Sequence, residues 1–477
     1  MKFLHDNKLK INIAIILIGI IFGLLISLIQ LESEVAFFFT FSILLIIALI
    51  PLLIYIRRYK SNSIFFYTGL IVTSLLLIPF KGFEFINFHI RLIDFAFVIM
   101  ALFFLVNFRS RKMEKFDIGI IMPIIGIIVY SCVLLLFQDY SIYNSLIDII
   151  ELFEVVFFIV FLDFILQKID QKRLRKIGYY IFLISLAGAC IRILFFFLTQ
   201  QRFVGMWFLI GITTYGLYYS GLKFIKRPNI PSFILICIFV ATIFLSRSRG
   251  TLFIIILVPL IYLVLRYRDI IKGYNIKRLF YLFSILIVVG LLISCFMPII
   301  SERISSIADQ SQGFYIRPIT WMAGIDILTY HPFGIGLKNF KPALQEQANN
   351  LFYPEWFVDI VGEEDIERTN GIIQTKGLGP HNDWISVLVG LGLIGLILYA
   401  LFWIKVFSKI INSPINNPIA IVFSLMIIEY FLRSFIGNIF LTPNFYVLIL
   451  FILLLRGSNH GKSKTKRDID NNSNIQL

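Results

Sequence analysis

The stretch "FLSRSRGTLFIIILVPLIYLVL", residues 244–265, decides the class of fold. Two arginines, Arg247 and Arg249, stand between two runs that otherwise consist almost entirely of hydrocarbon side chains. A run of about 20 apolar residues crosses a bilayer as one helix, because a helix satisfies its own backbone polar groups. A charged side chain near the bilayer core costs several kcal/mol. The stretch therefore predicts a membrane helix whose arginines need a specific reason to be there.

The composition of the whole chain agrees with a membrane protein. Of 477 residues, 59% are hydrophobic and 15% are charged, whereas about a quarter of a soluble domain is charged. A water-facing globule cannot bury that much apolar surface. The predicted fold is an all-α polytopic membrane protein with about 12–14 transmembrane helices and one long extracytoplasmic loop of short helices.

Apolar runs of membrane length recur along the chain. We predict spans near 11–30, 35–56, 63–80, 88–108, 118–138, 146–166, 177–199, 203–219, 230–246, 250–265, 279–300, 385–404, 418–437 and 440–455. The corresponding domains are an N-terminal helix bundle (1–300), an extracytoplasmic loop (301–384), C-terminal membrane helices (385–455) and a basic cytoplasmic tail (456–477).

Lysine and arginine predict the orientation. With the N-terminus in the cytoplasm, 30 of the 43 Lys and Arg residues fall on the inner side, as the positive-inside trend requires. The net charge of +15 is therefore mostly a topology signal and implies no nucleic-acid partner. Arg247 and Arg249 fall on the outer side against this trend, as does Arg202 in the turn "TQQRFVGMW". The alternative for Arg247 and Arg249 is that they only reach outer lipid headgroups.

The long segment 301–384 is net acidic, with six basic and eleven acidic residues. Helical spacing after Arg317 and Pro318 predicts a helix that ends before the turn "HPFGIG" (331–336), and a second helix is expected near 341–351. The segment ends at "GLGPHNDWISVLVG" (377–390), where Pro380 favours the first turn of a helix.

This helix start places His381 and Asp383 in the first turn, at the outer surface. A helix N-terminus disfavours a cationic imidazole, so His381 is biased toward the neutral form that a general base requires. The alternative is a purely structural histidine. Carboxylates also lie within the spans, and structural pairing is expected for them: Arg91 with Asp94, and Glu151 and Glu154 with Arg192 or Arg433, while Asp148, Asp163 and Glu429 stay without a named partner.

Three ordered motifs carry a resemblance to a known family. They are "SRSRG" (246–250), "IRPITWMAGIDILTYHPFGIGLKNF" (316–340) and "PHNDWISVLVGLGLIGLILYALF" (380–402). Together they resemble the O-antigen ligase/polymerase family over about residues 200–455. The "RFVG" of 202–205 is similar to the family's upstream Arg-x-x-Gly element, although the Pro-Asn that commonly follows it is absent.

The resemblance implies a multispan enzyme of the bacterial cytoplasmic membrane with its active site on the extracytoplasmic face. Such enzymes transfer a glycan from a polyprenyl diphosphate to an acceptor hydroxyl, with inversion and without a metal or cofactor. The planar guanidinium of arginine binds phosphate oxygens in pairs and stabilises the leaving diphosphate. We expect Arg249 and His381 to be catalytic, and the substrate-binding residues to be Arg202, Arg247, Arg317 and Asp383.

The expected partners are the lipid-linked glycan, an acceptor glycan or lipid, the bilayer and, as a further candidate, a chain-length regulator protein. A repeat-unit polymerase is preferred because it is the broader class; a ligase acting on lipid A–core is the first alternative. A transporter or flippase of lipid-linked glycan is another alternative, although the inverted repeats common among transporters are not evident. A non-catalytic assembly protein would give no reason for His381 beside outward-facing arginines.

Overall fold

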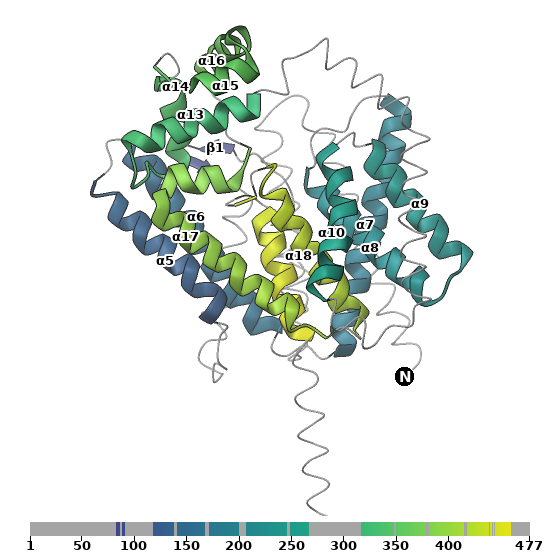
Figure 1. Ribbon diagram of the computed structural model, residues 1–477. Helices are drawn as coiled ribbons and strands as arrows, with labels where there is room; N and C mark the ends of the chain where they lie inside the picture. The colour runs from purple at the N-terminus through teal and green to yellow at the C-terminus, as the bar shows by residue number, and fades with distance from the viewer. Residues whose placement is uncertain are drawn as a thin grey trace, which may run out of the picture. The chain divides into compact units, whose positions relative to one another are not determined.

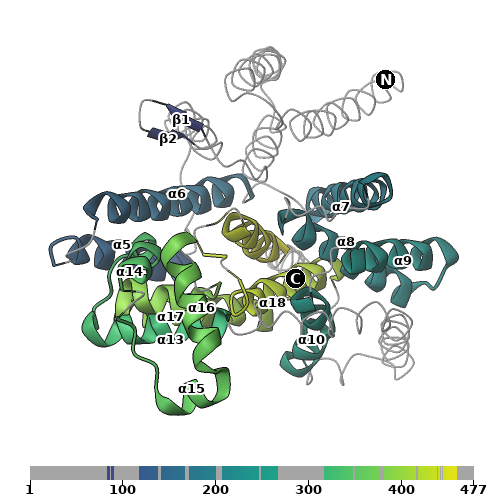
Figure 2. The ribbon, with the colours of Figure 1, turned by 90° about the horizontal axis from the view of Figure 1, so that it is seen from above.

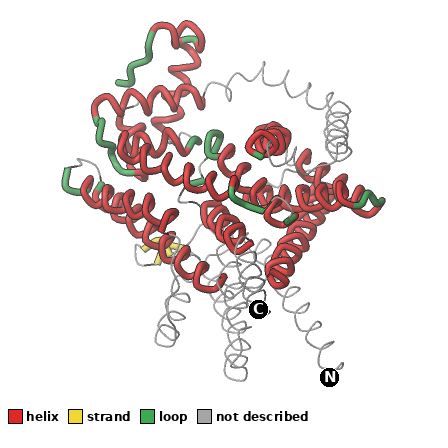
Figure 3. The backbone as a smooth tube through the Cα atoms, turned by 60° about the horizontal axis from the view of Figure 1, so that its bottom comes forward, coloured by secondary structure: helices red, strands yellow, loops and turns green. Residues whose placement is uncertain are grey.

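The computed structural model describes residues 83–85, 88–90, 118–137, 141–166, 171–199, 207–245, 249–266, 316–347, 350–376, 381–414, 417–437, 439–440, 442 and 444–458. The chain divides into two compact units, Met1–Asn107 and Phe108–Leu477, each described here by itself. Nearly all described residues are helical, as Figure 3 shows, which agrees with the all-α prediction.

A β-hairpin is the described part of the first unit. Strand β1 (Phe83–Phe85) pairs antiparallel with β2 (Phe88–Ile90), with Phe83 opposite Ile90. Phenylalanine favours strands, and a two-residue connection suits a hairpin. The predicted span 88–108 is therefore wrong for its first three residues. Its remainder and the spans predicted before residue 81 lie outside the described residues.

In the second unit, the described long helices each overlap a predicted span. They are α5 (Ile118–Leu134), α6 (Ile142–Leu166), α7 (Gln171–Thr199), α8 (Trp207–Lys226), α9 (Ile230–Leu245), α10 (Arg249–Leu265), α17 (Asp383–Ile411), α18 (Pro418–Arg433) and a C-terminal helix (Asn444–Ser458). The predicted span 279–300 and most of the basic tail lie outside the described residues.

Two sets of helices pack side by side (Figure 1). Helix α5 packs on α6 and α17, while α7, α8 and α9 pack together and α18 joins α8 to α10. Aromatic rings fill the contact between α8, α18 and the C-terminal helix, where Tyr215 stacks on Phe451 with ring centroids 5.7 Å apart. Large apolar side chains are also exposed on the outer surfaces of both sets of helices, for example Met122, Phe253, Leu393 and Ile404. An apolar exterior of this kind suits contact with lipid.

Among the described residues, α17 is the helix whose length and apolar composition both suffice to cross a membrane. The helices Gly119–Leu134, Ile230–Ile243, Phe253–Leu265 and Asn444–Ser458 are apolar but shorter. The predicted number of 12–14 spans remains a prediction.

The described part of the loop 301–384 folds into short helices. They are α13 (Ile316–Tyr330), the 3-10 turn η2 (Leu337–Asn339), α14 (Phe340–Gln347), α15 (Glu355–Val361) and α16 (Glu363–Lys376). The two predicted helices correspond to α13 and α14, whereas α15 and α16 were not predicted. In Figure 2 these helices lie over α17, which α13 contacts directly. A small apolar core around Ala323, Ile327 and Leu344 holds the segment together.

A second contact, which we call the glycine interlock, joins the turn 332–336 to residues 389–392 of α17. The turn donates two backbone hydrogen bonds, from Ile335 N–H to the Val389 carbonyl (3.2 Å) and from Gly336 N–H to the Gly390 carbonyl (2.7 Å). Helix α17 is broken at this point, because Gly392 adopts φ 61°. A Cβ atom on Gly392 would lie 2.5 Å from the Pro332 carbonyl oxygen, so glycine is required there.

Candidate active site

The first element of the site is the start of α10. Arg249 is the first residue of this helix, and Thr251 lies buried within its first turn. The predicted substrate ligands Arg202 and Arg247 lie outside the described residues, as does the side chain of Arg249. The structure therefore locates the beginning of the helix but not the arginine side chains.

The second element is the end of α18. Arg433 donates through Nε and Nη2 to Oε1 of Glu429, at 2.8 and 2.5 Å, and through Nη1 to the Thr251 hydroxyl at 3.4 Å. Glu429 is fully buried and also accepts a hydrogen bond from the Thr214 hydroxyl (2.9 Å). The predicted partners of Arg433, Glu151 and Glu154, are wrong: Arg433 pairs one turn back on its own helix, where spacing i,i+4 brings the two side chains together.

The third element is the start of α17. Its N-cap is Asn382, whose side chain accepts hydrogen bonds from the backbone N–H groups of Trp384 (2.9 Å) and Ile385 (3.2 Å). His381 precedes the cap with φ 47°, the left-handed conformation that non-glycine residues rarely adopt. The prediction that His381 lies in the first turn is thus wrong by two residues, because the Asn382 cap starts the helix at Asp383. A strained backbone of this kind is often found at functional sites.

Asp383 is part of the helix start but faces the protein interior. Its carboxylate is 1% exposed and accepts hydrogen bonds from Ile439 N–H (2.8 Å), Phe440 N–H (3.1 Å) and the Tyr399 hydroxyl (3.2 Å). A buried carboxylate with three donors is already satisfied. The expected substrate-binding role of Asp383 does not fit this geometry, which instead makes Asp383 a support of the helix start.

The ends of α10, α17 and α18 meet at two consecutive residues. Arg433 contacts Thr251, two residues after Arg249, while the Ser434 carbonyl accepts a hydrogen bond from Asp383 N–H (2.8 Å), two residues after His381. The Ser434 hydroxyl also accepts from the Trp384 indole N–H (2.9 Å). We call this contact of Thr251, Asp383, Arg433 and Ser434 the α18 junction. It brings together the helix starts that carry the two predicted catalytic residues.

Electrostatics at the mouth of the site favour a neutral histidine. His381 keeps an exposed edge, yet the surrounding protein partly desolvates its ring, and the guanidinium of Arg317 at the start of α13 repels a proton. Both effects, burial first, lower the pKa of His381 below its usual value. The predicted direction is confirmed, although burial and Arg317 cause the shift rather than the helix terminus on which the prediction rested. The predicted ligand Arg317, which is exposed, therefore acts electrostatically on His381.

Carboxylates of α6 contact the turn that precedes α14. The backbone N–H of Lys338 donates to Asp148 (3.0 Å), and its ammonium group pairs with Glu151 (2.6 Å). The expected pairing of Glu151 is thus confirmed in kind but with a different partner, because Lys338 comes from the loop. Glu154 accepts from the Tyr446 hydroxyl (3.4 Å), and Asp163 pairs with Arg456. Arg91 and Asp94 lie outside the described residues, and so does the side chain of Arg192.

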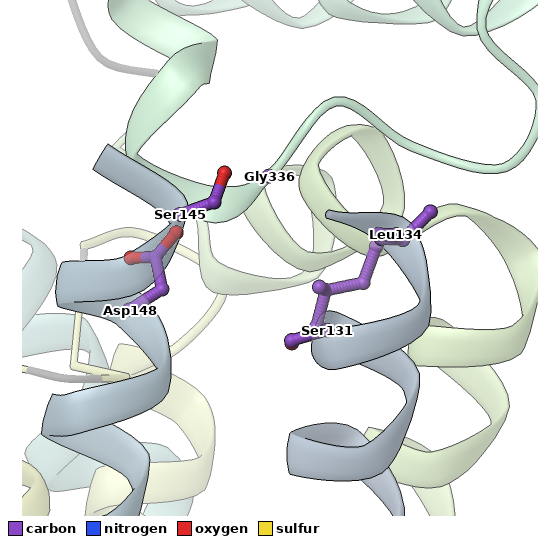
Figure 4. Close-up of a pocket in the computed structure, with 6 residues that line it drawn as sticks. Ser131, Leu134, Ser145, Asp148 and Gly336 are labelled. Atoms are coloured by element: carbon purple, nitrogen blue, oxygen red, sulfur yellow. The ribbon is translucent and has the colours of Figure 1, made fainter. Parts of the chain in front are cut away.

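A small pocket opens between α5, α6 and the turn before η2 (Figure 4). Ser131 and Leu134 of α5 face Ser145 and Asp148 of α6 across it, with Gly336 above, and Leu391 completes the lining. The sequence does not predict that Ser131, Asp148 and Gly336 line one pocket, because they come from three separate segments. The polar dipeptide Lys338-Asn339, inside the motif "GLKNF", is the sequence feature that could have indicated a contact of this turn with the carboxylates of α6.

Within the described residues, no group of three or more His, Cys, Asp or Glu side chains is arranged to hold a metal ion.

Residues 231–400 match the family model described as O-antigen ligase, which supports the resemblance to the O-antigen ligase/polymerase family. The matched region contains the start of α10 and the start of α17, but not the end of α18. No curated protein matches the chain. The match supports a membrane protein of the bacterial inner-membrane type that processes lipid-linked glycans of the O-antigen kind.

Proposed function

Because residues 231–400 match the O-antigen ligase family, we propose that the protein is a membrane glycosyltransferase. It moves a glycan from a polyprenyl diphosphate carrier to an acceptor hydroxyl on the outer face of the cytoplasmic membrane. The observation that carries this proposal is the α18 junction, where Arg433 contacts the start of α10 and Ser434 contacts the start of α17. A phosphate ligand on one helix start and a general base on the other are the two functions that glycosyl transfer needs.

In the proposed reaction, the acceptor oxygen attacks C1 of the carrier-linked sugar, and the bond from C1 to the phosphate oxygen breaks. The acceptor proton passes to a ring nitrogen of His381, whose lowered pKa keeps it neutral and able to accept. Attack opposite the leaving group inverts the configuration at C1. The carrier leaves as a diphosphate, so the main requirement is to stabilise its negative charge.

We assign that stabilisation to arginines at headgroup depth. Arg249, with Arg202 and Arg247, would bind the diphosphate, since a guanidinium fork matches phosphate oxygens and keeps its proton. Arg317, exposed beside His381, would contact the sugar-phosphate portion of the substrate. Asp383 holds the helix start and does not contact substrate.

A repeat-unit polymerase is the form we propose, with a ligase acting on lipid A–core as the alternative. Purified protein in detergent, given a lipid-linked glycan and a metal chelator, should join repeat units when a second lipid-linked glycan is the acceptor. Product only with lipid A–core would establish the ligase. A transporter would form no product under either condition, because detergent abolishes any gradient.

The proposal also requires one orientation of the protein in the membrane, with the α18 junction on the outer side. Basic residues at the end of the helices opposite the junction, for example Lys226, Arg227, Lys409 and Arg456, support a cytoplasmic location of that end. In a background without native cysteines, a membrane-impermeant reagent should label Glu364→Cys, exposed on α16, and fail to label Gly273→Cys. The reverse pattern contradicts an active site outside the cytoplasm.

A further inference from the structure

Arg433 makes contacts that a structural ion pair does not require. It is the last residue of α18, and its side chain is 11% exposed. A cation near a helix C-terminus is favoured by the helix dipole, and Glu429 one turn back supplies a counter-charge. These two effects explain why a guanidinium is tolerated at this depth, but they do not explain why it extends to a second helix at Thr251.

The guanidinium group is only partly used by the protein. Of its five N–H donors, three are directed to Glu429 and Thr251. Within the described part of the chain, the structure assigns no acceptor to the other two. A mostly buried charged donor normally has a partner, so a further acceptor is expected at the exposed edge.

The residues around Arg433 indicate which kind of acceptor fits there. Thr251 lies two residues after Arg249, and Ser434, next to Arg433, contacts Asp383 at the helix start that follows His381. The open donors of Arg433 thus belong to the junction between the predicted phosphate ligand and the predicted base. We infer that Arg433 is a further ligand of the carrier diphosphate, held in place by Glu429; this inference rests on the proposed function.

A paired substitution separates this role from a structural one. Replacing both partners, Arg433→Met with Glu429→Met, removes the two charges together, and such replacements of buried ion pairs are often neutral for stability. The matched control is Arg456→Met with Asp163→Met, which removes an ion pair of the same 2.5 Å length at the opposite end of the helices. Neither residue of the control pair belongs to the proposed site.

The measurements are thermal unfolding in detergent and the binding of a polyprenyl diphosphate without glycan. We expect both paired variants to fold, and only the Arg433/Glu429 variant to bind the diphosphate about 10- to 100-fold more weakly, as expected for a lost hydrogen bond to a charged group. Wild-type affinity in that variant overturns the role of Arg433. Failure of the wild-type protein to bind any polyprenyl diphosphate overturns the proposed function together with this inference.

Single substitutions keep the test decisive if the paired variant does not fold. At equal amounts of folded protein, Arg433→Gln should lose diphosphate binding, whereas Glu429→Gln, which leaves the guanidinium in place, should retain most of it. Equal losses from the two substitutions would mean that the pair only supports the fold.

Discussion

The α18 junction and the glycine interlock both fasten α17, but they use different chemistry. At the junction, side chains add to the backbone hydrogen bond from Asp383 to Ser434: Arg433 donates to the Thr251 hydroxyl, and the Trp384 indole donates to the Ser434 hydroxyl. Six residues further along, the interlock consists of backbone hydrogen bonds between residues 335–336 and 389–390. The junction therefore offers groups that can bind and react, while the interlock can only hold a shape. Substitutions in the two regions should separate loss of chemistry from loss of structure.

The largest effect is expected at the interlock. Gly392→Ala places a Cβ atom against the Pro332 carbonyl and forces alanine into a left-handed conformation, which together cost about 3 kcal/mol or more. We expect a much lower yield of folded protein, measured by thermal unfolding in detergent and by size-exclusion profile. Gly371→Ala, in open space on α16, is the control and should behave like wild type. A stable, active Gly392→Ala protein would mean that the interlock is not rigid.

The next effect concerns catalysis at the junction. His381→Ala should leave folding and donor binding intact and lower the transfer rate by about 10²–10⁴-fold, the usual effect of removing a general base. The experiment measures product formation at saturating acceptor alongside binding of the lipid-linked donor. More than about a tenth of the wild-type rate would contradict the base assignment.

A smaller but still large effect is expected at the start of α10. Arg249→Lys should lose most activity although it keeps the charge, because an ammonium group cannot reproduce a two-pronged contact with phosphate. Arg247→Lys should be milder. Donor titrations of both variants measure the difference, and near-normal polymer from Arg249→Lys would indicate that this arginine only anchors the helix in the headgroup layer.

The smallest effect is a change of pH dependence. Since Arg317 helps to lower the pKa of His381, the transfer rate should fall only at a pH below the usual histidine range of about 6.5. Arg317→Gln removes the repulsion, so the pKa rises and the acid limb of the kcat profile moves to higher pH. A profile unchanged by Arg317→Gln would contradict the electrostatic contact, whatever happens to KM.

The sequence predicts the helices of the junction and the interlock but not all the contacts between them. Long apolar runs locate the helices, since burial in lipid imposes their length, and Pro380 predicts the start of α17 to within a few residues. Arg433 was correctly expected to form an ion pair, but the prediction overlooked the local partner Glu429, four residues earlier on the same helix. Charges of α6 were expected to pair within the membrane, yet Glu151 pairs with Lys338 of the loop. Such contacts span nearly 200 residues and leave no local pattern.

The buried role of Asp383 shows the same limit at the site itself. Its place beside His381 in the sequence suggests that both side chains face the substrate. In the structure, the left-handed conformation of His381 and the cap at Asn382 direct the side chains of His381 and Asp383 apart. The Asp383 carboxylate therefore accepts hydrogen bonds from the backbone of residues 439–440. Only tertiary structure distinguishes the residue that faces solvent from the one that supports it.

Arg433 and Ser434 are neighbours on one chain, and this has a mechanical consequence. We expect a rotation of the last turn of α18 to displace its contacts with α10 and α17 together, because both are made by consecutive residues. In the proposed reaction, the spacing between the two helix starts would then stay constant whatever the length of the bound glycan. The proposed polymerase could therefore repeat the same step on a growing chain without readjusting its reactive groups.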